Sequence, residues 1–239
     1  MVSAAEILDI DQDRIVVWSL AQSLCKGARK YCEMTGRHAL GMHFSPKLLD
    51  AEKVSLCSKH NLVFKDYNLF KAVNTGFALP QISSCWKFPV LSVKLLYILT
   101  EMRKLYFLEN LSLEHLSLLF EVNMKAYSVY ATYHISAKGI FNEVHGLICF
   151  KIANSCMLGW LLRKCNGVWE YGLGEPLEEP SVVIVFKDIE LARKGILGKL
   201  DHMLDPVFGG VSIFGRIPLA DRFGYVARMI YQDLPSPNK

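Results

Sequence analysis

Histidines are the residues of this 239-residue chain whose type best suits proton transfer or metal binding near neutral pH. None is spaced from another histidine, a cysteine or an aspartate so that both would hold one metal ion from one helix face. His38 and His43 come nearest, with Gly41 between them. We therefore predict surface or loop histidines and no metal site. The seven are His38, His43, His60, His115, His134, His145 and His202.

Motifs for nucleophilic catalysis and phosphate binding are also missing. The sequence has neither the G-x-S-x-G turn that exposes a serine nucleophile nor the G-x-x-x-x-G-K-[ST] loop that binds phosphate. The segment 172–176 has two glycines, but Pro176 and the acidic Glu178 and Glu179 disfavour a phosphate there. A turn explains the segment, and solvation explains its acids. We expect no catalytic residue, no cofactor and no enzymatic activity.

The seven cysteines show neither a zinc-ligand pattern nor a disulfide framework. No pair has the C-x2-C spacing, and Cys25 and Cys32 lie on one side of an expected helix. We predict reduced thiols that fill small apolar spaces, in a reducing compartment. The seven are Cys25, Cys32, Cys57, Cys85, Cys149, Cys156 and Cys165.

Composition and charge exclude further classes of protein. Apolar residues make up 51% of the chain and charged residues 21%, which is too apolar for a disordered chain. The net charge is only +4, and the basic residues are scattered in pairs and triplets, so we expect no nucleic-acid partner. The acidic N-terminal segment lacks a signal-peptide pattern, and no stretch suits a membrane span. We expect a cytoplasmic protein, and the sequence leaves its oligomeric state open.

Apolar spacing of three and four residues predicts helices over the first half of the chain. Gly36 ends the first, Ser45-Pro46 gives an N-cap and first helical position for the second, and Pro89 begins the fourth. We therefore expect an all-helical N-terminal region, residues 1–125, of unknown role. The helices are expected at about residues 12–35, 45–58, 65–74, 89–107 and 112–134.

From about Gly146 the apolar period changes from 3.6 to 2, which predicts five short strands. Asn166-Gly167 suits a type I′ turn and indicates a hairpin between the second and third strands. Alternation gives each strand one packed face, and we place Lys151, Arg163 and Glu170 on the opposite, wetter face. The strands are expected within residues 146–155, 159–167, 167–174, 180–188 and 209–216.

Two helices are expected among and after these strands. Asp188 caps one over residues 189–204, and Pro218 begins another over residues 218–234. The predicted class is α+β: a five-stranded, mainly antiparallel sheet with helices on one face, preceded by the helical region. We place the second domain at residues 126–235.

The order of short motifs in the C-terminal part resembles the sterol carrier protein (type-two, nonspecific lipid-transfer) domain family. The resemblance covers about residues 143–231 and does not reach the first 125 residues. It implies a sterol-carrier-like domain with an apolar tunnel between the sheet and the C-terminal helices. Its marks are the strand 146–152, Asn166-Gly167, the strand 182–186, Lys187-Asp188, Gly198-Lys199-Leu200, Asp205-Pro206, the strand 210–215 and Leu219-Ala220.

This resemblance implies a non-enzymatic protein that binds or transfers a hydrophobic lipid, either a fatty acyl chain, a sterol or an isoprenoid. Burial of an acyl chain would contribute about 0.8 kcal/mol per CH2. Two alternatives remain open: an accessory or scaffold protein of lipid or quinone metabolism, and an enzyme whose catalytic part lies in the N-terminal half. The expected tunnel wall, which could equally be a filled core, is Ile148, Phe150, Trp169, Ile184, Phe186, Leu197, Phe208, Ile213, Leu219, Phe223, Val226 and Ile230.

The expected helix at Pro89 is apolar around most of its circumference, which allows two interpretations. Lys87 precedes it and Arg103 lies near its end, as suits a helix that docks transiently on a membrane surface. The other interpretation is a core helix, which we favour and which predicts that Leu95 and Leu99 are buried.

Overall fold

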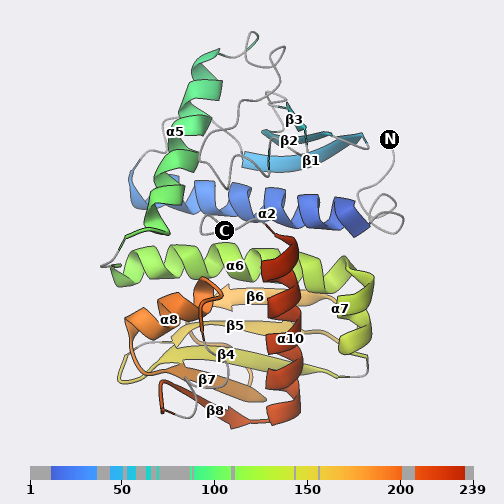
Figure 1. Ribbon diagram of the computed structural model, residues 1–239, viewed down its shortest axis with the longest axis vertical. Helices are drawn as coiled ribbons and strands as arrows, with labels where there is room; N and C mark the ends of the chain where they lie inside the picture. The colour runs from blue at the N-terminus through green and yellow to red at the C-terminus, as the bar shows by residue number, and fades with distance from the viewer. Residues whose placement is uncertain are drawn as a thin grey trace. The chain divides into compact units, whose positions relative to one another are not determined.

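The chain forms two compact units, residues 1–109 with 233–239 and residues 110–232. The structure, a computed structural model, describes residues 12–36, 44–50, 53–57, 63–65, 69, 87, 89–108, 111–142, 144–155, 157–200 and 208–234 (Figure 1). The predicted domain boundary after residue 125 stays a prediction; that residue lies within a helix that begins at Leu113. None of the described helices is long and apolar enough to cross a membrane.

The N-terminal unit contains two of the predicted helices and a sheet that was not predicted. Helix α2 (Gln12–Met34) is followed by Gly36, whose φ of 65° suits the stop expected there. Helix α5 (Pro89–Leu105) begins at the expected proline. Between them lies an antiparallel sheet in the order β1-β2-β3, made of β1 (Phe44–Asp50), β2 (Lys53–Cys57) and β3 (Val63–Lys65).

The prediction of a helix from Ser45-Pro46 is wrong, and so is that of an all-helical N-terminal region. Strand β1 is an edge strand, and its pairing with β2 is irregular between Phe44 and Lys47, where Pro46 lies. Proline is tolerated at an edge or a bulge because its missing N–H is not needed for the ladder. Of the short helix expected at residues 65–74, Lys65 ends β3, and the rest, apart from Leu69, lies outside the described residues.

The C-terminal unit has the predicted succession of helices and strands, with one short helix, α7, that was not predicted. Ser112 caps its first helix, because the serine hydroxyl accepts a hydrogen bond from the backbone N–H of His115. Asp188 caps α8 through the N–H of Leu191. The elements are α6 (Leu113–Tyr133), α7 (Ile135–Ile140), β4 (Gly146–Ile152), β5 (Met157–Arg163), β6 (Trp169–Leu173), β7 (Val182–Phe186), α8 (Ile189–Ile196), β8 (Val211–Gly215) and α10 (Ile217–Asp233).

Helix α8 is shorter than the helix expected over residues 189–204. It ends at Ile196, and Gly198 follows with a φ of 66°, a left-handed conformation that a helix cannot continue. Residues 201–207 lie outside the described residues.

The five-stranded sheet has the order β6-β5-β4-β7-β8 and is mixed, which corrects the prediction of a mainly antiparallel sheet. Strands β4, β5 and β6 form an antiparallel meander. The chain then crosses to the free edge of β4, where β7 pairs parallel to it, and β8 pairs antiparallel to β7. Residue alternation is the same in both kinds of pairing, so the sequence pattern could not reveal the parallel pair.

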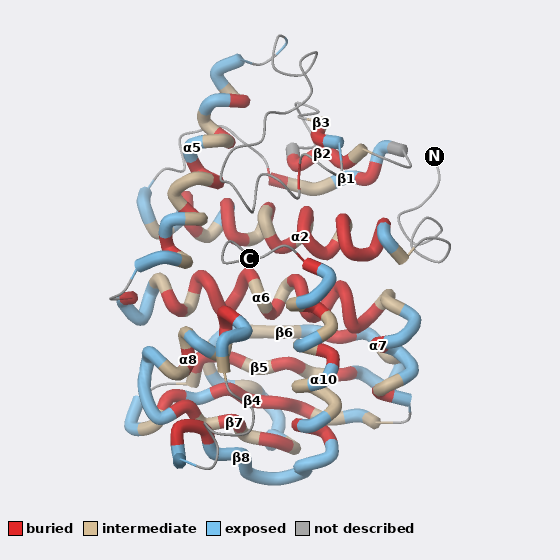
Figure 2. Tube along the Cα trace, in the orientation of Figure 1, coloured by how far each residue is buried: buried red, intermediate tan, exposed pale blue. Residues whose placement is uncertain are grey.

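Helices α6, α8 and α10 cover one face of this sheet (Figure 1). The predicted alternation is confirmed in β4 and β7, whose inward residues Ile148, Phe150, Ile184 and Phe186 are buried. Figure 2 shows buried stretches along α6 and along β4 and β5. These side chains are therefore available to line a core or a cavity beneath the helices.

Arg163 does not lie on the wetter face as predicted. It pairs with Trp169 across β5 and β6, and because paired residues share a face, it lies on the helix-covered side. It is buried, its guanidinium donates to the carbonyl of Val144 at 2.8 Å, and it lies 6.0 Å from the ring centre of Phe141. Burial lowers the pKa of Arg163.

The opposite face carries Lys151 and Glu170, which are exposed as predicted. It is not uniformly wet, however, because Cys149 on the same face is fully buried. Burial raises the pKa of the Cys149 thiol to about 11. This thiol is therefore a small apolar filler, as the sequence predicts. Cys25 and Cys32 are also buried, and the Cys25 thiol donates a hydrogen bond to the carbonyl of Leu56 at 3.3 Å.

Candidate functional site

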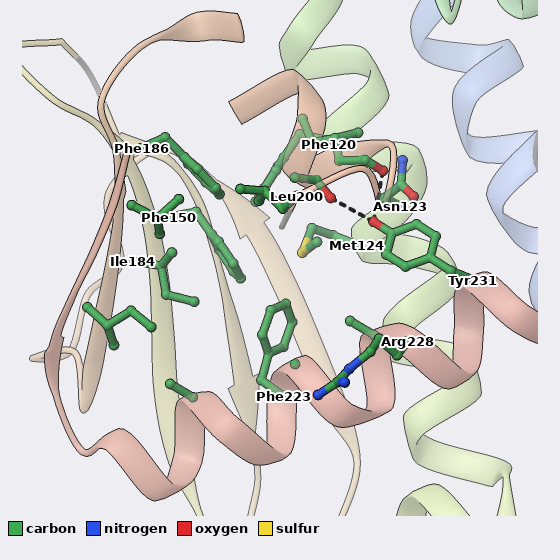
Figure 3. A pocket seen from close by; sticks show the side chains of 18 of the residues that line it. Phe120, Asn123, Met124, Phe150, Ile184, Phe186, Leu200, Phe223, Arg228 and Tyr231 are labelled. Carbon is green, nitrogen blue, oxygen red and sulfur yellow. Dashed lines mark hydrogen bonds between the residues drawn. The ribbon is translucent and has the colours of Figure 1, made fainter. Parts of the chain in front are cut away.

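A cavity of about 210 Å³ lies between the inner face of the five-stranded sheet and helices α6, α8 and α10 (Figure 3). Strands β4, β7 and β8 supply one wall, and α10 supplies the wall opposite. Most of the lining is apolar. The lining residues are Phe120, Asn123, Met124, Phe150, Ile184, Phe186, Gly195, Ile196, Gly198, Leu200, Val211, Ile213, Ala220, Asp221, Phe223, Gly224, Ala227, Arg228 and Tyr231.

Three phenylalanines from three elements form one side of the cavity. Phe150 on β4 lies between Phe120 on α6 and Phe223 on α10, with both ring-centre distances 5.3 Å. Edge-on and tilted ring pairs at such distances are favourable beyond the area they bury. The aromatic contacts hold α6 and α10 against the sheet, and Figure 3 shows the three rings facing the cavity.

Tyr231 closes the cavity where α8 meets α10. Its hydroxyl lies 2.9 Å from the carbonyl oxygen of Gly195 and 2.8 Å from that of Ile196, and donates to this pair (Figure 3). Its ring lies against Gly198, where an added Cβ would come within 2.8 Å of a ring atom. Glycine is therefore required at residue 198 both by the left-handed backbone and by the close approach of the ring.

Small residues on α10 leave room for the cavity. Ala220, Gly224 and Ala227 recur every three or four residues, so they lie on one stripe of the helix, and all three line the cavity. A Cβ placed on Gly224 would meet no atom within 4 Å. A larger side chain at residue 224 would therefore have room to extend into the cavity.

Polar groups lie at the border of the cavity. Asp221 and Arg228 on α10 line it and are exposed, so the cavity reaches the surface beside them. Asn123 on α6 also lines it, but its amide donates to the carbonyl of Leu119 at 2.9 Å. The arrangement offers one carboxylate and one guanidinium near the opening and apolar walls behind them.

Only some of the predicted wall residues line the cavity. The structure brings Phe150, Ile184, Phe186, Ile213 and Phe223 together around the cavity. Phe208 is 78% exposed and does not line it. The others are at least nine-tenths buried but lie outside its lining: Ile148, Trp169, Leu197, Leu219, Val226 and Ile230. That any of these residues binds a ligand stays a prediction.

Sequence reasoning missed the cavity residues on α6 and the small residues of α10. Phe120 and Met124 line the cavity from α6 but were not among the expected wall residues. The stripe of Ala220, Gly224 and Ala227 was a usable signal, because small residues on the inward side of an amphipathic helix leave space against a sheet.

A buried aromatic group adjoins the cavity on the far side of Phe223. Tyr127 packs against Phe223 with ring centres 4.9 Å apart and against Trp169 with centres 5.5 Å apart. Among the described residues, nothing hydrogen-bonds to the Tyr127 hydroxyl or to the Trp169 indole nitrogen. Burial raises the pKa of Tyr127 well above its usual value, so this hydroxyl is neutral.

Histidines and acids do not gather into a metal site in the part of the chain that the structure describes. His115 lies beside the Ser112 cap, with Nδ1 3.0 Å from the serine hydroxyl, and His134 stacks on Tyr130. His145 is exposed. The remaining histidines lie outside the described residues.

Comparisons with known proteins were made at the level of sequence and of structure. No protein-family model matches the chain, and no curated protein matches it significantly. The chain is similar to the solution structure of the sterol carrier protein domain 2 of Helicoverpa armigera, over 48% of this chain and 89% of that chain. That structure comes from the family whose motifs the C-terminal sequence resembles. At 19% identity and a TM-score of 0.37, the similarity assigns no ligand.

Proposed function

We propose that the C-terminal unit is a non-enzymatic module that binds the apolar chain of a lipid in the cavity between the sheet and α10. The observation that carries this proposal is a mostly apolar cavity of about 210 Å³ between the sheet and the helices, which opens at the surface beside Asp221 and Arg228. A concave, mostly apolar space with a few polar groups is the usual form of a site for a small ligand.

The volume of the cavity limits the size of ligand that can fit. A protein cavity of roughly 150 Å³ binds benzene, whereas pockets for drug-sized molecules span roughly 300–1,000 Å³. The cavity of about 210 Å³ therefore suits a short stretch of acyl chain rather than a whole sterol ring system. The polar end of such a ligand would lie at the opening, beside Asp221 and Arg228.

The lining chemistry supports binding without reaction. Among the described residues, its polar side chains are Asn123, Asp221, Arg228 and Tyr231, which provide no pairing of a serine or cysteine nucleophile with a base. The Tyr231 hydroxyl is already engaged with two backbone carbonyls. The proposed role is to hold a ligand unchanged, as a carrier or a sensor of lipid does.

A series of straight-chain alcohols from 1-butanol to 1-decanol tests the proposal. Each added CH2 that enters the cavity should tighten binding about fourfold, corresponding to about 0.8 kcal/mol. The gain per CH2 should stop once the cavity is full. Binding is measured by titration in a heteronuclear NMR experiment, with shifts expected at residues around Phe150 and Phe223. Absence of saturable binding by every alcohol would show that the proposal is wrong.

A further inference from the structure

Helix α5 has one buried face and one exposed apolar face. Its buried side includes Leu95 and Leu99, as expected of a core helix. On the other side Val90, Val93 and Tyr97 are 64%, 67% and 46% exposed. Positions i, i+3 and i+7 form one stripe of a helix, so these side chains make a continuous apolar strip, here called the α5 strip.

Further exposed apolar residues follow at the C-terminal end of the helix. Phe107 and Leu108 are both exposed in the turn after α5. Single exposed apolar side chains are common on proteins, whereas clustered ones mark surfaces that contact a partner. The α5 strip together with this end therefore requires a partner of defined chemistry.

The charges around the α5 strip identify that partner. Residues 87–108 contain four basic residues, Lys87, Lys94, Arg103 and Lys104, against the single acid Glu101, a net charge of +3. Lys104 pairs with Glu101, which raises the lysine pKa and keeps it protonated. A strip of valine and tyrosine bordered by cations complements a surface that is apolar beneath and negatively charged at its rim.

A second copy of this chain is a poorer partner for the same strip. Packing two α5 strips against each other would bring together two segments, residues 87–108 of each copy, of net charge +3, and like charges at close range are unfavourable. A span is excluded as well, since α5 has 17 residues and none of the described helices could cross a membrane.

We propose that the α5 strip docks on the surface of an anionic lipid bilayer. Val90, Val93 and Tyr97 insert at the boundary between headgroups and acyl chains, and the flanking lysines contact anionic headgroups. Leu95 and Leu99 meanwhile keep the opposite side of the helix in the core of the N-terminal unit. This docking does not depend on the cavity of the C-terminal unit, so either proposal can fail while the other stands.

Sedimentation with vesicles tests the docking. The full chain is mixed with vesicles of phosphatidylcholine alone or with 30% phosphatidylserine added. The chain should sediment with the anionic vesicles, and raising the salt concentration from 0.1 to 0.5 M should weaken binding because charges are screened. Equal binding to both vesicle types, or binding to neither, would overturn the proposal.

Two variants assign the binding to the α5 strip. Val90→Glu combined with Val93→Glu should lower the fraction bound to anionic vesicles about tenfold, since two apolar anchors are lost and two negative charges are added. Leu177→Glu is the matched control, because Leu177 is fully exposed in the loop between β6 and β7; it should bind like the wild type. Thermal unfolding checks that all variants are folded.

The results distinguish a lipid surface from a second copy of this chain as the partner of the α5 strip. Wild-type binding by the folded double variant would overturn the proposal. So would a concentration-dependent dimer in analytical ultracentrifugation that the double variant abolishes, because the α5 strip would then be an interface between copies of this chain. Exposed side chains tolerate substitution, so the double variant should fold.

Discussion

Tyr127 and Trp169 are the residues whose burial is hardest to explain by packing alone. Tyr127 is 3% exposed and Trp169 is 4% exposed, yet the hydroxyl and the indole N–H find no partner among the described residues. Such groups are uncommon in folded proteins because an unpaired buried donor costs about 1–3 kcal/mol. Tyr127 packs against Phe223, which lines the cavity, and Trp169 packs against Tyr127, but neither Tyr127 nor Trp169 belongs to the lining.

The variant Tyr127→Phe tests whether this hydroxyl has a partner in solution. Removing a buried hydroxyl without a partner should leave the free energy of unfolding unchanged or raise it by up to about 1 kcal/mol. The ring contacts with Trp169 and Phe223 would be kept. Urea denaturation of the two proteins measures the difference. A loss of about 1–3 kcal/mol would mean that an acceptor or a bound water occupies the site.

Individual cavity residues were partly predictable from sequence. Alternation along β4 and β7 placed Phe150, Ile184 and Phe186 on the packed face, and the structure puts all three around the cavity. The same alternation also selected Ile148, which is buried but outside the lining. An inward stripe of apolar residues shows only which side chains are buried. The position of a cavity depends also on the sizes of the residues on the facing helix, here Ala220 and Gly224.

At the scale of elements, capping and turn signals were reliable where they act locally. Asp188 makes the predicted cap hydrogen bond, and Asn166-Gly167 lies between β5 and β6 as predicted. The helix predicted from Ser45-Pro46 was wrong because the same pair also suits an irregular edge strand. The pairing of β4 with β7 depends on where the chain returns to the sheet after β6. Local residue patterns do not encode this.

Helix α5 yields a prediction about stability. Leu95 is fully buried, so Leu95→Glu would place a carboxylate among apolar side chains and should unfold the N-terminal unit. Val93→Glu, on the exposed face of the same helix, should change the free energy of unfolding by less than about 0.5 kcal/mol. Circular dichroism during urea denaturation distinguishes them. Equal stability of the two variants would contradict the two-faced description of α5.

At the scale of the molecule, the cavity is a property of residues far apart in the chain. Its walls come from α6, β4, β7, α8, β8 and α10, so residues from Phe120 to Tyr231 must be assembled before the space exists. This is why the residue pattern could predict the sheet and its covered face but not the size of the cavity. An apolar space between the sheet and the C-terminal helices was expected only from the family resemblance. The role of the N-terminal unit rests on the proposed docking of α5.

The central claim is that the cavity beside α10 is where an apolar chain binds, and Gly224→Leu tests it most directly. Gly224 lines the cavity, and a Cβ there meets nothing within 4 Å, so a leucine can fill the space. Replacing a glycine within a helix should also stabilise the protein, by roughly 0.5–1 kcal/mol. A loss of binding could then not be attributed to unfolding.

Gly139→Leu is the matched control, because Gly139 is an exposed helical glycine of α7 that also meets nothing within 4 Å and does not line the cavity. The measurement is the dissociation constant of 1-octanol by NMR titration. The account predicts at least about tenfold weaker binding by Gly224→Leu, since a filled cavity excludes the chain, and wild-type binding by Gly139→Leu. Wild-type binding of 1-octanol by a folded Gly224→Leu protein would contradict it.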